Sequence, residues 1–208
     1  MTLIASSVIG TVYSLPPFRL KRFPHLAAAC ILAVRGSVIN AGFYAHAQQT
    51  AAFGMGGVGS SVWSPFALMA RDPKCALLAG YFTLFGVVIA LMKDVPDVEG
   101  DRKFNIPSFS VRVGQAGMFK FARRLLTALL WGTGAALGAA SYTAWQASTP
   151  LLSACSRGAL GAGAIAAGQL VRHKSAAVVP EDSAQVYAFY MYLWKLFYFS
   201  YLCLPLAK

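Results

Sequence analysis

The stretch KDVPDVEGDRK, residues 93–103, gathers most of the acidic side chains of this protein. Four of the seven acidic residues of the 208-residue chain lie within it: Asp94, Asp97, Glu99 and Asp101. Three cationic residues flank them: Lys93, Arg102 and Lys103. Neighbouring carboxylates repel one another unless a cation neutralises them. The stretch therefore indicates a site for a cation, and the flanking positive charges indicate an anionic ligand beside it.

Asp94, Asp97 and Asp101 are spaced i, i+3 and i+7. On a continuous helix, residues with this spacing project from one face, within roughly 60° of one another. Such a helix would have to hold Pro96 in its first turn, because a proline farther inside breaks a helix. Mg²⁺ commonly binds one or two carboxylates together with substrate phosphates. We predict a Mg²⁺ site formed by these three aspartates; the alternative is a solvated, charged loop between two membrane spans.

A second basic cluster lies in YSLPPFRLKR, residues 13–22. Its cations are Arg19, Lys21 and Arg22. Arginine makes bidentate contacts to phosphate oxygens, and lysine supplies a point charge. Taken alone, the cluster is explained by an ordinary positively charged loop of a membrane protein. Opposite carboxylates that hold Mg²⁺, it would form a second clamp on a diphosphate.

The composition places these clusters in a membrane protein and not in a soluble α/β enzyme. Hydrophobic residues make up 57% of the chain and charged residues only 12%, whereas a soluble domain carries about 25% charged residues. The net charge of +11 does not indicate nucleic-acid binding, because the cations flank apolar blocks and form no basic run interleaved with aromatic residues. The four cysteines show no metal-type spacing and are explained as small buried residues.

Apolar segments long enough to cross a bilayer, about 20 residues each, recur along the sequence. One partial and about five full spans are predicted: 1–14, 26–48, 75–92, 119–142, 151–171 and 185–206. Small residues such as Gly134 and Gly138 favour close helix–helix packing in lipid. We therefore predict an all-α fold, a polytopic transmembrane helix bundle in which residues 1–208 form a single membrane domain.

Loops between consecutive spans alternate between the two faces of the membrane. The segments 15–25, 93–118 and 172–184 therefore share a face, which holds twelve of the eighteen cations. This asymmetry predicts that the acidic segment lies on the cytoplasm-like side, the stroma in a plastid. Arg35 and Lys195 fall within spans, where charge is costly, and are expected to face the bundle interior. For Lys195, snorkelling to an interface is the alternative.

The sequence resembles the UbiA superfamily of membrane-embedded aromatic prenyltransferases. KDVPDVEGDRKFNIPSFSVRVGQ is similar to the second Asp-rich motif of that family, and YSLPPFRLKR is similar to its Tyr-x-x-x-Lys-type loop. Within the superfamily, CILAVRGSVINAGFYAHAQ, PSFSVRVGQ and YMYLWKLFYFSYLCLPLAK resemble the homogentisate prenyltransferases of plastids and cyanobacteria. The resemblance covers nearly the whole chain.

The resemblance implies a helical membrane bundle that transfers a prenyl group from a prenyl diphosphate to homogentisate, with loss of carbon dioxide. Asp97 and Asp101, together with Asp94, would hold Mg²⁺. The diphosphate would be lined by one tyrosine and five cations: Tyr13, Arg19, Lys21, Lys93, Arg102 and Lys103. Arg35 or Asn40 would contact the aromatic acid. The prenyl tail would lie in an apolar groove that opens to the lipid bilayer.

The resemblance leaves the prenyl donor open. The segments CILAVR and WKLFY favour a phytyl donor, which would make a methyl-prenyl-benzoquinol of tocopherol biosynthesis. The segment YSLPPFRLKRF favours a solanesyl donor, as in plastoquinone biosynthesis. We expect phytyl transfer in a chloroplast membrane, with a cyanobacterial membrane as the alternative.

The first Asp-rich motif of the family, of the form Asn-Asp-x-x-Asp, has no counterpart in this sequence. We therefore expect the chain to correspond to the C-terminal two-thirds of a UbiA-type prenyltransferase. The alternatives to an active enzyme are a truncated, inactive product and a transport protein that uses the acidic residues as an ion gate. The transport protein is disfavoured, because the acidic residues follow the end of a span and do not lie at mid-membrane.

Overall fold

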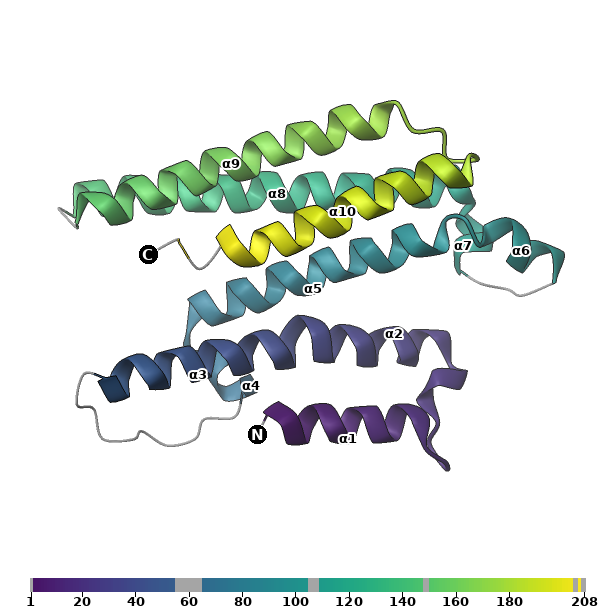
Figure 1. Ribbon diagram of the computed structural model, residues 1–208, viewed down its shortest axis with the longest axis horizontal. Helices are drawn as coiled ribbons and strands as arrows, with labels where there is room; N and C mark the ends of the chain where they lie inside the picture. Colours follow the sequence, from purple (N-terminus) through teal and green to yellow (C-terminus); the bar gives the residue numbers. More distant parts are fainter. Residues whose placement is uncertain (1, 55–64, 105–108, 148–149, 204–205, 207–208) are drawn as a thin grey trace. The chain divides into compact units, whose positions relative to one another are not determined.

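The computed structural model describes residues 2–54, 65–104, 109–147, 150–203 and 206 (Figure 1). Within these residues every regular element is helical, which confirms the predicted all-α fold. The chain divides into two compact units, Met1–Val87 and Val88–Lys208. Helix α5 (Pro73–Asp94) carries the chain from the first unit into the second. The single membrane domain expected from the sequence stays a prediction.

The first unit consists of a short apolar helix, a long interrupted helix and the first part of α5. Its other elements are α1 (Thr2–Ser14), the 3-10 helix η1 (Leu20–Arg22), α2 (Pro24–Leu32), the π-helix η2 (Ala33–Val38), α3 (Ile39–Gly54) and α4 (Pro65–Arg71). Pro24 begins α2, where its fixed φ and missing N–H suit the first turn. The elements α2, η2 and α3 form one continuous rod (Figure 1), and α1 packs against α2 and η2.

A close contact joins η2 to α5 within the first unit. Gly36 is buried in η2, and a Cβ atom at this position would overlap the side chain and Cα of Thr83. Ser37 Oγ lies 3.5 Å from Thr83 Oγ1, and Thr83 Oγ1 donates to the carbonyl oxygen of Ala79 at 2.7 Å. Because Gly36 has no side chain, the two helices can approach almost to backbone contact.

Polar contacts tie α3 to the start of α5. Tyr44 Oη donates to Asp72 Oδ2 at 2.7 Å, and Gln48 Nε2 donates to Tyr44 Oη at 2.8 Å. Asp72 Oδ1 accepts the backbone N–H of Lys74 at 2.9 Å. Burial alone would raise the pKa of the Asp72 carboxyl, but the hydrogen bonds from Tyr44 and from the backbone hold that pKa below its usual value. Asp72 therefore stays ionised and caps α5.

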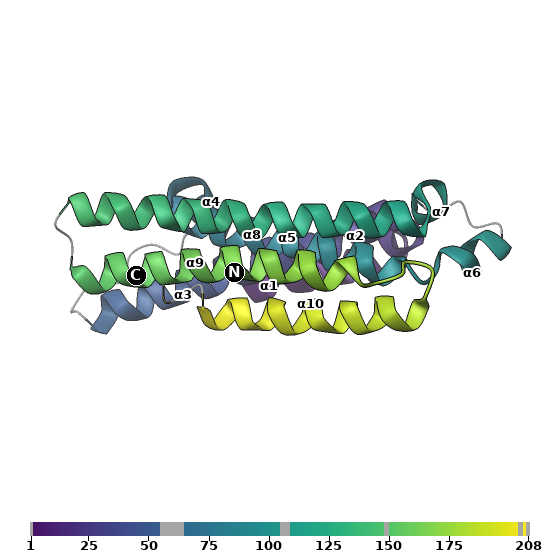
Figure 2. The same cartoon turned by 90° about the horizontal axis from the view of Figure 1, so that it is seen from above.

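The second unit is built on a long helical hairpin. Helices α8 (Gln115–Gln146) and α9 (Leu151–Ala176) run antiparallel and in contact (Figure 2). A Cβ atom placed on Gly161 would lie 2.9 Å from the carbonyl oxygen of Gly134 and 3.1 Å from the backbone nitrogen of Gly138. The predicted close packing is therefore confirmed at Gly134, with α9 as the partner helix, whereas a Cβ atom on Gly138 would meet nothing within 4 Å.

Cation–π contacts hold the basic end of α9 against both neighbouring helices. The Arg172 guanidinium lies 5.4 Å from the ring centroid of Trp131 on α8. The Lys174 ammonium lies 5.0 Å from the ring centroid of Tyr192 on α10 (Ser183–Cys203). Contacts of this kind strengthen where water is excluded. The end of α9 is thus fixed between α8 and α10.

Two short helices lie at the same end of the hairpin. They are α6 (Val98–Lys103) and α7 (Phe109–Val113), and they connect α5 to α8. Both views place α6 and α7 at the end where α9 passes into α10 (Figures 1 and 2). The described parts of the segments 93–118 and 172–184, which were predicted to share a face, therefore lie at one end of this unit.

The six predicted apolar segments each correspond to helical structure: α1, the rod from α2 to α3, α5, α8, α9 and α10. Among the described residues, three helices are long and apolar enough to cross a membrane: Ala28–Gln48, Lys74–Asp94 and Gln115–Gln146. Glycine in α9 and tyrosine in α10 lower the mean hydropathy of those two helices. The number of full spans, predicted as about five, stays a prediction.

Replacing Gly161 by alanine should loosen the pair formed by α8 and α9. The added Cβ would meet the carbonyl oxygen of Gly134 at 2.9 Å, so one helix must move. Overpacking of this kind costs about 1–3 kcal/mol, and we expect a lower melting temperature in detergent micelles. Gly163 on the same helix has open space at its Cβ and provides the matched control. An equal loss of stability in Gly163→Ala would contradict this packing account.

Asp182 caps α10 and should make stability depend on pH. Its Oδ1 accepts the backbone N–H groups of Gln185 and Ala184 at 3.2 and 2.9 Å, and Gln185 Nε2 donates to Oδ2 at 2.7 Å. The backbone and side-chain bonds from Gln185 hold the pKa of the Asp182 carboxyl below its usual value. The stabilisation is therefore complete above the unfolded-state pKa of about 4 and is lost as the pH falls through the lower folded-state pKa.

Melting temperatures measured in acid should reveal this contribution. We expect the wild type to lose stability more steeply than Asp182→Asn below about pH 4, because asparagine keeps an acceptor oxygen and does not titrate. Coincident pH profiles for the two proteins would show that the Asp182 carboxylate does not stabilise α10.

Candidate functional site

The acidic segment is two helices joined by a turn, whereas its spacing suggested one continuous helix. Helix α5 ends at Asp94, residues 95–97 form the turn, and α6 begins at Val98. Pro96 lies in the turn, so the prediction that it occupies the first turn of a helix is wrong. Proline disfavours helical backbone in the residue before it and has no N–H to donate, which explains why the chain breaks here.

Apolar side chains anchor the acidic segment to the second unit. Met92 and Val95 are fully buried, and Val98 is 2% exposed. Asp94 and Asp97, each of which directly precedes one of the two valines, are exposed. Because the apolar residues recur at every third position, the segment buries one side and turns its carboxylates outward.

The three aspartates remain neighbours despite the break. Asp97 and Asp101 are one turn apart, and the Asp101 N–H donates to the Asp97 carbonyl oxygen at 2.9 Å. The charges of Lys93, Asp97 and Asp101 all act on the Asp94 carboxylate. Asp97 occupies the N-cap of α6, yet its carboxylate makes no capping hydrogen bond. We refer to Asp94, Asp97 and Asp101 as the aspartate cluster.

The aspartate cluster has donor chemistry that fits Mg²⁺. Its ligands are carboxylate oxygens, and Mg²⁺ completes its coordination with water and substrate phosphates. In the part of the chain that the structure describes, no three His, Cys, Asp or Glu side chains are grouped closely enough to hold a metal ion by themselves. Mg²⁺ binding by the aspartate cluster therefore stays a prediction.

Cationic residues border the aspartate cluster in the same unit. Lys93 lies in the last turn of α5, and Arg102 and Lys103 lie in the last turn of α6. All three side chains are exposed. A phosphate group could contact these cations through some of its oxygens while others face a metal ion. The structure thus keeps six of the predicted site residues in one segment: Lys93, Asp94, Asp97, Asp101, Arg102 and Lys103.

The other predicted diphosphate contacts belong to the first unit. Tyr13 is half-buried in the last turn of α1. Arg19 is exposed and precedes η1 with a φ of 40°, in the left-handed region that ordinary side chains rarely adopt. Lys21 lies within η1. Their contact with a diphosphate stays a prediction.

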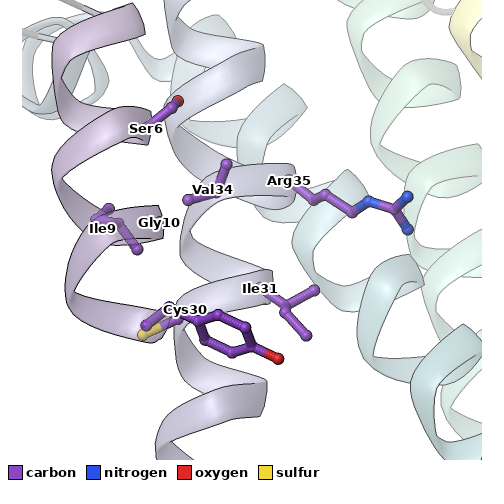
Figure 3. Close-up of a pocket in the computed structure, with 8 residues that line it drawn as sticks. Ser6, Ile9, Gly10, Cys30, Ile31, Val34 and Arg35 are labelled. Atoms are coloured by element: carbon purple, nitrogen blue, oxygen red, sulfur yellow. The ribbon is translucent and has the colours of Figure 1, made fainter. Parts of the chain in front are cut away.

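Tyr13 also borders an open groove between α1 and the rod formed by α2 and η2 (Figure 3). The groove has a volume of about 250 Å³. Its walls are mostly apolar: Ile9, Gly10, Cys30, Ile31 and Val34. Arg35 lines the groove as well, but its side chain leaves η2 on the side away from α1 (Figure 3). An apolar groove of this kind suits a hydrocarbon chain.

Asn40 makes contacts that sequence analysis missed. Its side chain is 3% exposed, and Nδ2 donates to the carbonyl oxygens of Arg35 at 2.9 Å and of Gly36 at 2.7 Å. Its amide nitrogen is therefore committed to the backbone of η2. The only sequence signal is an amide residue inside an apolar span. The predicted contact of Asn40 with an aromatic acid is not tested by these bonds.

Lys195 was expected to face the interior of a bundle. Its side chain is exposed on α10, between the buried residues Leu193 and Phe197. Both the position inside a bundle and the alternative, snorkelling to an interface, stay predictions.

Comparison with known proteins identifies the class of protein. The UbiA prenyltransferase family matches residues 1–196, a range that includes the aspartate cluster and the groove at Tyr13. The chain therefore belongs to the UbiA prenyltransferase family, as its motifs predicted, and it is a membrane protein. No solved structure matches the chain.

Individual relatives of this chain are homogentisate prenyltransferases by name. The chain is 35% identical to a homogentisate phytyltransferase of Synechocystis, over all of this chain and 59% of that protein. It is 36% identical to homogentisate phytyltransferase 1 of Arabidopsis thaliana, over 99% of this chain and 47% of that protein. It is 44% identical to the homogentisate solanesyltransferase of Arabidopsis thaliana, over 49% of this chain and 23% of that protein. The first two of these relatives match the whole of this chain, and the chain spans about half of their length.

Metal binding by the aspartate cluster can be measured without turnover. Mn²⁺ takes the oxygen ligands that Mg²⁺ takes and is detected by electron paramagnetic resonance. In the presence of pyrophosphate, we expect Asp97→Asn combined with Asp101→Asn to weaken Mn²⁺ binding at least roughly tenfold, since even outer-shell partners of a metal are worth 10- to 100-fold. Glu99→Gln removes one nearby acid outside the cluster and should bind normally. Equal losses in both proteins would indicate a general charge effect and not a site.

Proposed function

We propose that this protein transfers a prenyl group from a prenyl diphosphate to homogentisate. The observation that carries the proposal is the aspartate cluster with its bordering cations at the end of α5, a helix apolar enough to cross a membrane. A prenyl diphosphate has a charged head and an apolar tail, so it needs such a charged end beside an apolar region. The homogentisate acceptor is supported by the names of relatives that match the whole chain.

Phytyl diphosphate is the proposed donor. Two relatives that carry phytyltransferase in their names, those of Synechocystis and Arabidopsis thaliana, match over 100% and 99% of this chain. The solanesyl donor is the second candidate, because the homogentisate solanesyltransferase is the more identical relative, at 44%, over the part of the chain that it matches. The two donors share the diphosphate head and differ in the length of the tail.

The residues of the acidic segment would bind the leaving group. UbiA prenyltransferases generally use Mg²⁺ with diphosphate substrates. Asp97 and Asp101, with Asp94, would hold Mg²⁺, which when bound neutralises part of the diphosphate charge. Lys93, Arg102 and Lys103 would contact the remaining oxygens and stabilise the negative charge that develops as the C–O bond breaks. Tyr13, Arg19 and Lys21 are proposed as further diphosphate contacts.

The reaction balances with homogentisate as the acceptor. The C–O bond of the donor breaks, and its electron pair leaves with the diphosphate. A ring carbon of homogentisate forms the new C–C bond to the allylic carbon and loses its proton. The carboxylate leaves as carbon dioxide, and the side-chain carbon takes up a proton to become a methyl group. The product is a methyl-prenyl-benzoquinol.

We further propose a plastid or cyanobacterial membrane as the location, with the acidic segment on the stromal or cytoplasmic side. The names of relatives from both sources support this location. Helix α6 lies at one end of the second unit, and the described cations at that end support the orientation. They are Arg112, Lys120, Arg123, Arg124, Arg172 and Lys174.

The proposal is tested with membranes that contain this chain, supplied with homogentisate, Mg²⁺ and one prenyl diphosphate at a time. We expect a prenylated methylquinol, formed fastest from phytyl diphosphate. Asp101→Asn should lower the rate roughly 100-fold, the size of effect known for one electrostatic group at a transition state. Glu99→Gln is the control and should keep nearly normal turnover.

Two outcomes would contradict the assignment. Near-normal turnover of Asp101→Asn would exclude this residue from the reaction. Faster product formation from solanesyl diphosphate would replace the proposed donor by the second candidate.

A further inference from the structure

The helical hairpin of α8 and α9 is longer than the apolar layer of a membrane is thick. Tyr142 and Trp145 are 63% and 66% exposed on α8, near the end that joins α9. Exposed tyrosine and tryptophan side chains of membrane helices gather at the membrane–water interface. From Trp145 back to Arg124, α8 is about 32 Å long, close to the roughly 30 Å of a hydrocarbon layer. Trp145 and Arg124 therefore mark the two surfaces of that layer on α8.

Helix α9 gives the same limits. From its first residue, Leu151, to Arg172 it is also about 32 Å long. Arg157 is the only charged residue between Arg124 and Arg172 in the sequence. Its guanidinium donates to the carbonyl oxygen of Ala140 at 3.4 Å, so this charge has a partner within the hairpin. The part of the hairpin between the two limits can therefore lie in lipid.

Helix α8 extends past this layer. It continues beyond Arg124 for about 14 Å, back to its first residue, Gln115. The short helix α7 contacts α8, and it lies at the end of the unit where α9 passes into α10 (Figures 1 and 2). Six cations gather on α7, on the first turns of α8 and on the last turns of α9, and we call them the basic rim. They are Arg112, Lys120, Arg123, Arg124, Arg172 and Lys174.

The basic rim lacks a counter-charge from the chain. Among the residues that the structure describes, no ion pair joins any of its six cations to an aspartate or a glutamate. Asp182 begins α10 in the same unit, but its carboxylate already accepts the backbone N–H groups of Ala184 and Gln185. The uncompensated positive charge of the rim therefore attracts anions from outside the chain.

Aromatic rings hold two cations of the rim in place. The Arg172 guanidinium lies 5.4 Å from the ring centroid of Trp131, and the Lys174 ammonium lies 5.0 Å from that of Tyr192. The indole of Trp131 is itself fixed, because it packs so closely over Gly168 that a Cβ atom there would lie 2.6 Å from Nε1. A ring contact does not neutralise a cation. Because the two side chains are already ordered, an anion that binds them costs less side-chain entropy.

Large apolar side chains lie among the cations of the rim. Phe121 is 53% exposed and Val113 is 41% exposed. Lys120 and Arg124 are one turn apart on the same face of α8, and Phe121 follows Lys120 directly in sequence. Cations interleaved with exposed apolar residues are typical of surfaces at the boundary between lipid headgroups and acyl chains. The rim therefore suits a lipid better than a soluble anion.

We propose that the basic rim binds the anionic headgroups of membrane lipids, with Phe121 at the boundary between headgroups and acyl chains. The rim lies at the right depth, because the apolar layer ends at Arg124 and Arg172. A hairpin longer than the layer can tilt or slide in it, and bound headgroups fix its depth. The inference goes beyond the proposed function, since it needs no prenyl substrate.

Two tryptophans can report which lipids lie at the two ends of the hairpin. Trp131 lies two turns from Arg124 on the same face of α8, so the acyl chain of a lipid held at Arg124 passes close to it. Trp145 lies at the opposite surface. The test uses two proteins that keep only Trp131 or only Trp145, with phenylalanine in place of the other tryptophans, in phosphatidylcholine bilayers.

Fluorescence quenching by lipids with brominated acyl chains gives the local lipid composition. The brominated lipid is either phosphatidylglycerol or phosphatidylcholine with the same chains. At Trp131 we expect about a fivefold preference for the anionic lipid, the effect of one cation near a membrane surface. At Trp145 we expect no preference. Added salt should weaken the preference at Trp131, because exposed charges are screened.

Substitutions in the rim test whether its charges cause the preference. Lys120→Gln combined with Arg124→Gln should remove most of the preference at Trp131. Lys120→Arg combined with Arg124→Lys keeps both charges and should keep the preference, which separates charge from any effect on folding. Arg71→Gln combined with Lys74→Gln removes the same charge from the first unit and should also keep it.

Three results would overturn the proposal. The first is equal quenching of Trp131 by the two brominated lipids. The second is a preference that survives the two glutamine substitutions in the rim, or that falls equally with those in the first unit. The third is loss of the preference when inorganic phosphate replaces chloride at constant ionic strength, which would show that the rim binds soluble phosphate and not a lipid headgroup.

Discussion

An apolar surrounding offers no hydrogen-bond partners, so every polar group in a membrane helix needs a partner within the protein or a ligand. This constraint shapes both units. In the first, the amide of Asn40 donates to two carbonyl oxygens of η2, and the start of α5 is capped by Asp72. In the second, the aspartate cluster lies where α5 ends, while glycine pairs such as Gly134 and Gly161 let helices meet where no polar contact is needed.

The same constraint explains why the aspartate cluster lies where α5 ends. Carboxylates are too costly for the interior of a span, yet a prenyl diphosphate must keep its tail in an apolar region. Val95 and Val98 resolve this conflict, because they anchor the turn and α6 to the packed core while Asp94 and Asp97 stay exposed. This arrangement supports the proposed binding of a substrate with a charged head and an apolar tail.

Much of this arrangement could be predicted from the sequence. Apolar segments of span length predicted the helices, because a long apolar segment in lipid must pair its own backbone groups and does so as a helix. The spacing of Asp94, Asp97 and Asp101 predicted their proximity, although the break at Pro96 gives them two helices instead of one. The π-helix and its contacts with the Asn40 amide and with Thr83 could not be predicted, since Thr83 is distant in sequence and no local pattern indicates the wider turn. The partner of Gly134 was likewise set by packing and not by a local pattern.

The central claim is that one chain couples prenyl transfer to the loss of the homogentisate carboxylate. The most direct measurement uses homogentisate labelled in its carboxyl group and membranes that contain this protein, with phytyl diphosphate and Mg²⁺. The account predicts that labelled carbon dioxide and prenylated methylquinol appear together in equal amounts, and that both require the prenyl diphosphate. Carbon dioxide released without the donor, or a prenylated product that keeps the label, would contradict it.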